Sequence, residues 1–172
     1  WNGPEPAHLD AAPVIASRAA CDLNPIDLTN EAAFLRLKSY IWPDQAGRLA
    51  RLDAAAELAR HMGVRVEQAD AGDWLAQKLT KRPSEGLTVI YHSVFLVYPS
   101  KEDVARMKRL IEEAGAAATE TASLAWLCFE PESLFGGDRA SPRMQTRLQV
   151  WPGDEPRILN ESDGHVTYVD MP

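Results

Sequence analysis

Short apolar stretches recur along the chain and predict strands. They lie at residues 14–20, 64–68, 87–97, 124–129 and 146–151. The stretch 87–97 is almost continuously apolar, which is typical of a strand that is covered on both faces.

Apolar residues at helical spacing fill the intervals between the first four strands. They predict two helices after the first strand and one helix after each of the next two. The expected N-caps are Thr29 or Asn30, Asp44, Asp70 and Ser100, and Gly63 and Gly115 are expected to end the second and fourth helices.

This alternation of strands and helices predicts a three-layer α/β domain over residues 1–172, with a mostly parallel sheet and right-handed crossovers. The last strands have no helices between them, so we expect them to form an antiparallel edge. Segments 157–160 and 166–169 flank Asp163-Gly164, a pair that is favoured in tight turns, and they predict a terminal hairpin.

The composition narrows the classes of function. The 172 residues carry a net charge of −7, which argues against binding to a nucleic-acid backbone. No apolar run approaches the roughly 20 residues of a membrane-spanning helix. Cys21 and Cys128 are far apart and lack clustered histidines, so we expect no metal site, although a single disulfide stays an alternative. We expect a protein of the reducing cytoplasm with no membrane partner.

Acidic residues follow the first two predicted strands. In parallel sheets, ligands bind beyond the carboxyl ends of the strands, and a carboxylate there can accept the hydroxyls of a ribose or an adenine amino group. The candidate cofactor-binding residues are Asp22, Asn24, Asp27, Asp70 and Ala71. A plain alternative exists for each acid, because Asp70 could serve only as an N-cap and the others could form Asx turns.

His92 is the candidate catalytic residue, because an imidazole titrates near neutral pH and could exchange a proton with a substrate. A neutral, hydrogen-bonded histidine in a buried strand is the competing interpretation. Ser93 follows directly, but neighbours on a strand point to opposite faces, so the two should not form a nucleophile and base pair. Ser93 is therefore a candidate substrate contact.

Trp42, Gln45 and Arg48 form the most distinctive polar group of the first two helices. Trp42 could stack on a planar ring of the substrate while Gln45 and Arg48 hold a polar or anionic group. An exposed pair between Asp44 and Arg48, four positions apart, explains the same residues without a ligand.

These motifs together resemble the C-terminal half of a bacterial family known as domain of unknown function 2332. The residues that carry the resemblance are Asp22-Leu23-Asn24-Pro25-Ile26-Asp27, Trp42-Pro43-Asp44-Gln45, Arg48-Leu49, Arg51-Leu52, Ala69-Asp70-Ala71 and His92-Ser93. The family has no established reaction, and its members are longer, with a glycine-rich segment upstream. The resemblance implies that this chain is a fragment without its first strand and glycine-rich loop.

The order of elements is more distantly similar to class I S-adenosylmethionine-dependent methyltransferases, which have a Rossmann-like sheet. Asp22 and Asp70 match the ribose-binding and adenine-side acids of that family. The similarity implies S-adenosylmethionine as cofactor and a substrate near His92. The chain departs from it by having no GxGxxG turn, two helices between the first two strands, and no acidic or Asn-Pro-Pro motif after residues 87–97.

Two other functions stay open. A non-catalytic interaction domain would have kept the fold without its site and would associate with itself through an exposed sheet edge. A nicotinamide-dependent enzyme would need the same glycine turn that this sequence lacks.

Overall fold

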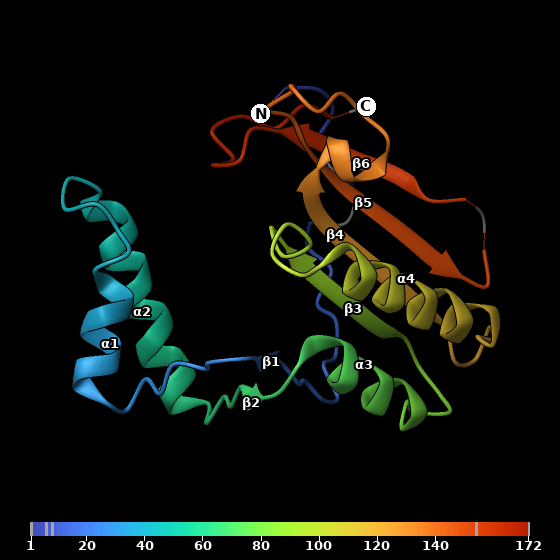
Figure 1. Ribbon diagram of the computed structural model, residues 1–172, viewed down its shortest axis with the longest axis horizontal. Helices are drawn as coiled ribbons and strands as arrows, with labels where there is room; N and C mark the ends of the chain where they lie inside the picture. The colour runs from blue at the N-terminus through green and yellow to red at the C-terminus, as the bar shows by residue number, and fades with distance from the viewer. Residues whose placement is uncertain (1, 6, 8, 154, 172) are drawn as a thin grey trace. The chain divides into compact units, whose positions relative to one another are not determined.

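The computed structural model describes residues 2–5, 7, 9–153 and 155–171 (Figure 1). The strands are β1 (Cys21–Asp22), β2 (Glu67–Gln68), β3 (Thr88–Ser93), β4 (Leu124–Pro131), β5 (Met144–Trp151) and β6 (Arg157–Ser162). The helices are α1 (Glu31–Lys38), α2 (Ala46–His61), α3 (Ala71–Thr80), α4 (Lys101–Ala116) and the 3-10 helix η1 (Glu132–Phe135).

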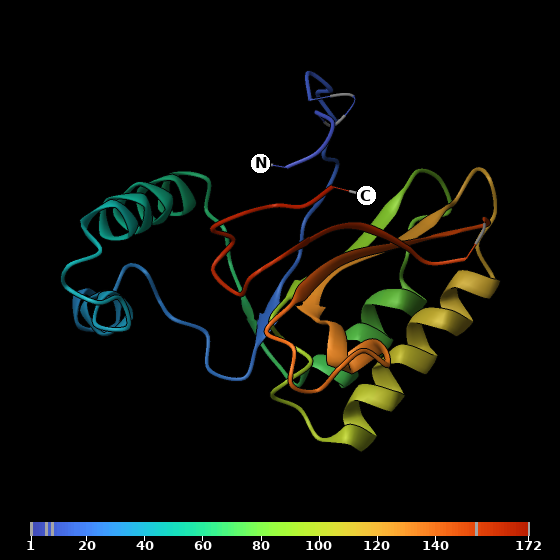
Figure 2. The same ribbon diagram turned by 90° about the horizontal axis from the view of Figure 1, so that it is seen from above.

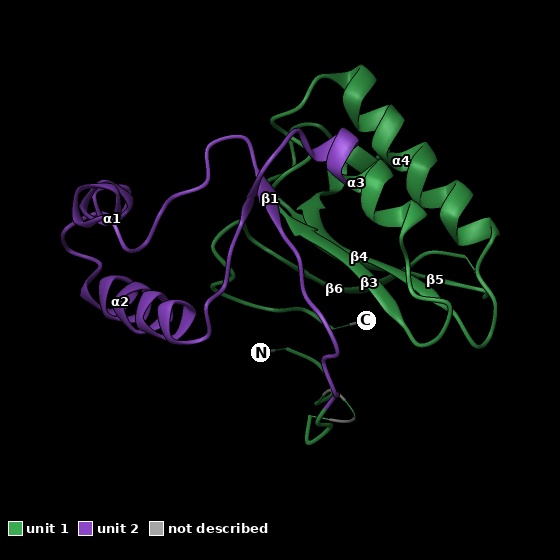
Figure 3. Cartoon of the chain, turned by 90° about the horizontal axis from the view of Figure 1, so that it is seen from below, with its two compact units in different colours: residues 1–12, 75–172 green, residues 13–74 purple. Residues whose placement is uncertain are grey.

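The chain divides into two compact units, which are coloured separately in Figure 3. One comprises residues 13–74, and the other comprises residues 1–12 and 75–172. We call them the helical-pair unit and the sheet unit. The expectation of a single domain stays a prediction.

The helical-pair unit holds α1 and α2 next to each other. Asn30 caps α1 as predicted, because its side chain accepts a hydrogen bond from the Ala33 amide at 3.0 Å. Lys38 forms a 2.8 Å ion pair with Asp53 of α2. Side-chain contacts of this kind hold the two short helices in one unit.

Helix α2 has the predicted apolar stripe, since Leu49, Leu52, Ala56 and Ala59 are its least exposed residues. Its N-cap is Gln45 rather than the expected Asp44, and Gln45 makes no side-chain capping bond. Gly63 follows the helix in the left-handed conformation, as expected from its position.

The strands of the helical-pair unit are shorter than predicted. β1 and β2 pair in parallel over two residues each, with Cys21 opposite Glu67 and Asp22 opposite Gln68. The prediction of a buried strand at 14–20 was wrong, because these residues are exposed and belong to no strand, although the Ala20 carbonyl accepts from the Glu67 amide at 2.8 Å beside β1. Most of the segment is Ala, Ser and Arg, which bury too little apolar surface to hold a strand in place.

The sheet unit is built on four strands in the order β3-β4-β5-β6. β3 and β4 run in parallel with α4 between them in sequence, and the other two pairings are antiparallel. The predicted antiparallel edge is confirmed. The described strands do not form the mostly parallel sheet that we expected, because β4, β5 and β6 follow one another without crossover helices.

Strand β3 is shorter and more exposed than expected from its sequence. It covers Thr88–Ser93, and its side chains alternate between half-buried and exposed. Val89 is 47% and Tyr91 is 77% exposed, so the expectation of a strand covered on both faces was wrong. The chain leaves the strand at Val94, which has a φ of 50°. Beyond it, residues 95 and 96 bond to a side chain of β4 instead of continuing the strand.

Helix α4 covers the face of the sheet opposite to the exposed side chains of Val89 and Tyr91. The part of α3 in this unit lies on the same side as α4 (Figure 2). The predicted stripe is confirmed, because Met107 and Ile111 are buried. The Ser100 side chain caps the helix by accepting from the Asp103 amide at 3.1 Å. Gly115 does not end the helix as expected; it is the point at which α4 meets Trp151 of β5, where a Cβ would collide with the indole.

The terminal hairpin forms between other strands than predicted. β6 pairs with β5, and residues 166–169 form no strand. The carboxylate of Asp163 instead accepts bonds from the Thr167 amide and hydroxyl, which closes a tight turn. After this turn, Asp170 forms isolated β-bridges with Glu161 and with Asn2.

Candidate functional site

A buried carboxylate holds the imidazole of the predicted catalytic residue. His92 lies near the carboxyl end of β3, and its Nδ1 is 2.7 Å from Oε1 of Glu130 on the neighbouring strand β4. Glu130 has 0% of its surface exposed. The parallel register pairs His92 with Cys128, so His92 and Glu130 share the face of the sheet that α4 covers.

Trp126 determines which nitrogen of His92 carries the proton in the neutral ring. The indole Nε1 donates to His92 Nε2 at 2.9 Å, and an indole N–H can only donate. His92 Nε2 is therefore an acceptor, and Nδ1 is the protonated nitrogen that donates to Glu130. Both ring nitrogens are occupied, so this geometry favours the interpretation of His92 as a hydrogen-bonded structural group over that of an acid or base.

Glu130 also fixes the loop that follows β3. Its Oε1 accepts from the backbone amides of Phe95 at 2.8 Å and Leu96 at 3.2 Å. Sequence analysis did not single out Glu130. The available signal was an acidic residue placed by strand alternation on the same face as Leu124, Trp126 and Cys128.

Ser93 is exposed at the end of β3, on the opposite face from His92, as strand alternation predicted. The structure does not bring the Ser93 hydroxyl and the His92 imidazole together. Their roles as substrate contact and catalytic group stay predictions.

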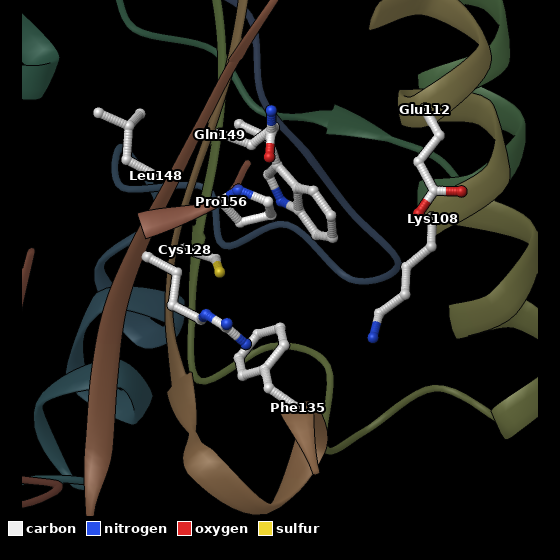
Figure 4. Close-up of a pocket in the computed structure, with 9 residues that line it drawn as sticks. Lys108, Glu112, Cys128, Phe135, Leu148, Gln149 and Pro156 are labelled. Atoms are coloured by element: carbon white, nitrogen blue, oxygen red, sulfur yellow. The ribbon is translucent and has the colours of Figure 1, made fainter. Parts of the chain in front are cut away.

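A pocket of about 180 Å³ opens between α4 and the sheet (Figure 4). Its lining residues are Lys108, Glu112, Trp126, Cys128, Phe135, Arg147, Leu148, Gln149 and Pro156. All of them belong to the sheet unit. Pro156 lies between β5 and β6, and the others come from α4, β4, η1 and β5. The pocket therefore shares strand β4 with the contact between His92 and Glu130.

Cys128 lies at the floor of this pocket as a buried thiol. Burial, reinforced by the charge of Glu130, raises the pKa of Cys128 from 9.0 to about 11, although Arg147 opposes the shift. The residue is therefore a neutral thiol at physiological pH and a weak nucleophile. Neither Cys21 nor Cys128 is in a disulfide.

The predicted cofactor-binding residues belong to the helical-pair unit, and two of them are close together. The Ala69 amide donates to the carbonyl of Asp22, the last residue of β1, at 3.1 Å. Asp70 directly follows Ala69 and therefore lies close to the end of β1. Asn24 lies two residues after Asp22, and its amide donates to Oδ1 of Asp22 at 2.7 Å. Ala71 directly follows Asp70.

The acidic side chains also have the local roles that formed the plain alternative. Asp70 Oδ1 accepts from the Asp73 amide at 3.0 Å and so caps α3. Asp27 Oδ1 accepts from the amide and hydroxyl of Thr29, and these bonds lower the pKa of Asp27 below 3.8. Each acid thus uses one carboxylate oxygen in a local hydrogen bond, and ligand binding would have to use its second oxygen.

Trp42, Gln45 and Arg48 lie at the connection between α1 and α2. Trp42 is 74% exposed, and the Arg48 guanidinium donates to Gln45 Oε1 at 3.2 Å. The expected pair between Asp44 and Arg48 is replaced by this contact. Among the described residues, no group of three His, Cys, Asp or Glu side chains is placed to hold a metal ion.

A sequence model of a bacterial family, described as "Uncharacterized protein conserved in bacteria (DUF2332)", matches residues 1–170. The chain belongs to this family. No curated protein and no solved structure matches it. Within this DUF2332 chain, no helix of the described part is long and apolar enough to cross a membrane.

Proposed function

We propose that this DUF2332 chain binds an adenine-containing small molecule beyond the carboxyl ends of β1 and β2, with S-adenosylmethionine as the first candidate. Methyl transfer is the reaction class that such a cofactor implies, and the cytoplasm is the compartment where we place it. The observation that carries the proposal is the bond from the Ala69 amide to the Asp22 carbonyl, which brings Asp22 and Asp70 to one edge of the β1 and β2 pair.

The chemistry of these two acids fits a nucleoside. Oδ1 of each carboxylate accepts a hydrogen bond from a backbone amide. The second oxygen of each carboxylate can accept further hydrogen bonds. Asp22 would accept from ribose hydroxyls, and Asp70, at the start of α3, would accept from the adenine amino group. The parallel pairing of β1 and β2 supports the Rossmann-like relationship, because ligands of parallel sheets bind at this edge.

Thermal denaturation tests the proposal directly. A ligand that binds only the folded state at a hundredfold excess over Kd stabilises it by about 2.7 kcal/mol, which would raise Tm by roughly 5–10 °C for a chain of this size. We expect this shift with S-adenosylmethionine and S-adenosylhomocysteine and none with guanosine, which has no amino group at the adenine position. The absence of a shift with either adenosyl compound would contradict the proposal.

The variant Asp70→Asn separates ligand binding from helix capping. Asparagine caps helices about as well as aspartate, so the amide Oδ1 can still accept from Asp73. Its Nδ2 can only donate, so the acceptor for an adenine amino group is lost. We expect unchanged Tm without ligand and a loss of the ligand-induced shift.

Asp138→Asn is the matched control. Asp138 Oδ1 accepts from the Ala140 amide at 2.9 Å in a loop of the sheet unit, so this aspartate also has one oxygen in a local backbone hydrogen bond. This variant should keep the full ligand-induced shift. Equal loss in both variants would show that the effect does not depend on the β1 and β2 edge.

A second candidate function is self-association through β3. This strand is the outermost in the order β3-β4-β5-β6, and its exposed face carries Val89 and Tyr91. An exposed apolar edge strand is a template for pairing with another chain. Sedimentation of the chain should then give a dimer that Val89→Lys weakens, whereas a monomer at all concentrations would exclude it.

A further inference from the structure

Two cationic side chains converge on one aromatic ring in the pocket between α4 and the sheet. The Arg147 Cζ lies 4.3 Å and the Lys108 Nζ lies 5.2 Å from the centroid of Phe135. Arg147 comes from β5 and Lys108 from α4, and Figure 4 labels Lys108 and the Phe135 ring. The ring attracts each cation, but the two cations repel each other. An anion between them would remove that repulsion.

Arg147, which lines the pocket, also has an unused donor. Its Nε is buried and has no hydrogen-bond partner among the described residues. Buried N–H groups are almost always paired, and an unpaired one in a native fold needs an explanation such as a bound ligand. The guanidinium is charged at any physiological pH, so the missing partner is best supplied by an anionic oxygen.

The acidic groups nearby do not fill this role. Glu112 lines the pocket from α4, one helical turn after Lys108, and its side chain is exposed. Glu130 lies on the same face of β4 as Cys128. Its Oε1 is held by His92 and by the loop after β3, and its buried Oε2 makes no hydrogen bond to a described residue, Arg147 included. Among the described residues, neither Lys108 nor Arg147 therefore has a carboxylate as an ion-pair partner.

Much of the remaining lining is apolar, although Gln149 and Glu112 add polar side chains. Trp126, Pro156 and the neutral thiol of Cys128 supply apolar surface to the pocket. The Trp126 indole N–H is already committed to His92, so the ring offers only its apolar surface. A ligand that fits both parts has an anionic end and a planar or apolar body.

We propose that this pocket is a binding site for a small organic carboxylate, with the carboxylate held between Arg147 and Lys108 and the apolar body against Trp126. The site is separate from the β1 and β2 edge and does not depend on the function proposed there. Phe135 positions the guanidinium, because a stacked Arg147 presents its N–H groups in a fixed plane.

Titration of the chain with benzoate tests this site. We expect saturable binding, followed by NMR through the Trp126 indole resonance, and no binding of benzamide, which has the same body without the charge. Inorganic phosphate should bind at least about tenfold more weakly, because it gains nothing from the apolar wall. Equal binding of phosphate and benzoate would overturn the assignment of an organic ligand.

Two variants test the cations. Lys108→Gln and Arg147→Gln should each weaken benzoate binding by about tenfold or more, as expected for the loss of a charge-assisted hydrogen bond. The matched controls are Lys101→Gln on α4 and Arg157→Gln on β6, which are exposed and do not line the pocket. Lys108 is half-buried at the pocket rim, so its variant keeps the test valid if Arg147→Gln fails to fold. Undiminished benzoate binding by Lys108→Gln, or no benzoate binding by the parent chain, would overturn the proposal.

Discussion

The Nδ1 of His92 lies 2.7 Å from Oε1 of Glu130, and this contact joins the end of β3 to a carboxylate that has no exposed surface. The same oxygen accepts the Phe95 and Leu96 amides. One side chain therefore fixes both the imidazole and the loop at the carboxyl end of β3. This gives Glu130 a structural role that its position near the end of an apolar strand did not reveal.

Substitution of Glu130 should lower the free energy of unfolding, and the loss should grow with the number of hydrogen-bond donors that are left without an acceptor. Glu130→Ala leaves His92 Nδ1 and two backbone amides unpaired in a buried site, at a cost of about 3 kcal/mol in the free energy of unfolding. Glu130→Gln keeps an acceptor oxygen and should cost less. Urea denaturation measures the difference, and equal costs for the two variants would contradict the role of Oε1.

The two thiols should differ in reactivity. Cys128 is buried and its pKa is raised to about 11, whereas Cys21 is partly exposed. Alkylation with iodoacetamide at about pH 8 should label Cys21 first and Cys128 only after unfolding, because the thiolate is the reactive form. Mass spectrometry of the labelled peptides decides this. Prompt labelling of Cys128 in the folded chain would show that its thiol is not shielded.

The same pKa shift predicts lower stability at alkaline pH. The unfolded thiol titrates near 9.0 and the folded thiol near 11, so the unfolded state releases its proton first as the pH rises. The contribution of Cys128 to stability is complete below pH 9.0 and is lost as the pH rises through about 11. Cys128→Ala should flatten this part of the curve of unfolding free energy against pH. A curve with the same slope in both proteins would contradict the shift.

Gly115 and Gly47 form a matched pair of helical glycines. A Cβ at Gly115 would collide with the Trp151 indole, whereas a Cβ at Gly47 would meet only Arg51 Nη1 at 3.9 Å. Gly115→Ala should therefore destabilise by about 1–3 kcal/mol through overpacking. Gly47→Ala should stabilise by about 0.5–1 kcal/mol through the better helix propensity of alanine. Denaturation curves that shift in the same direction would refute the packing argument.

Asp163 should titrate below its ordinary range. The Thr167 hydroxyl and amide donate to its carboxylate, and they lower the pKa of Asp163 below 3.8. Its contribution to stability is present above the pKa of the unfolded state and is lost as the pH falls through the folded pKa. Thr167→Val should raise the pKa, which carboxyl-carbon NMR can follow. A pKa that does not move would assign the shift to another group.

The sequence predicted the helices better than the strands. The caps at Asn30, Asp70 and Ser100 were found because capping is local, and each side chain bonds to an amide three residues later. Gly115 was misjudged because a glycine within a helix looks like a helix end unless the partner is known. Its requirement comes from Trp151, which is distant in sequence.

The strands depended on partners that the sequence pattern does not identify. Residues 166–169 have the alternation of a strand, but β6 pairs with β5, and the turn at Asp163 directs the chain elsewhere. His92 was found from its chemistry. No local motif predicted the contacts of Glu130, Lys108 and Arg147. These contacts depend on strand register and on packing between separate elements.

The central claim is that an adenine-containing ligand binds beside Asp22 and Asp70. Amide chemical shifts recorded during titration with S-adenosylhomocysteine test it most directly. The proposal predicts that the largest changes occur at Asn24, Ala71 and Asp73, with none at Trp126 or Arg147. Changes confined to other residues, or no changes at saturating concentration, would contradict it.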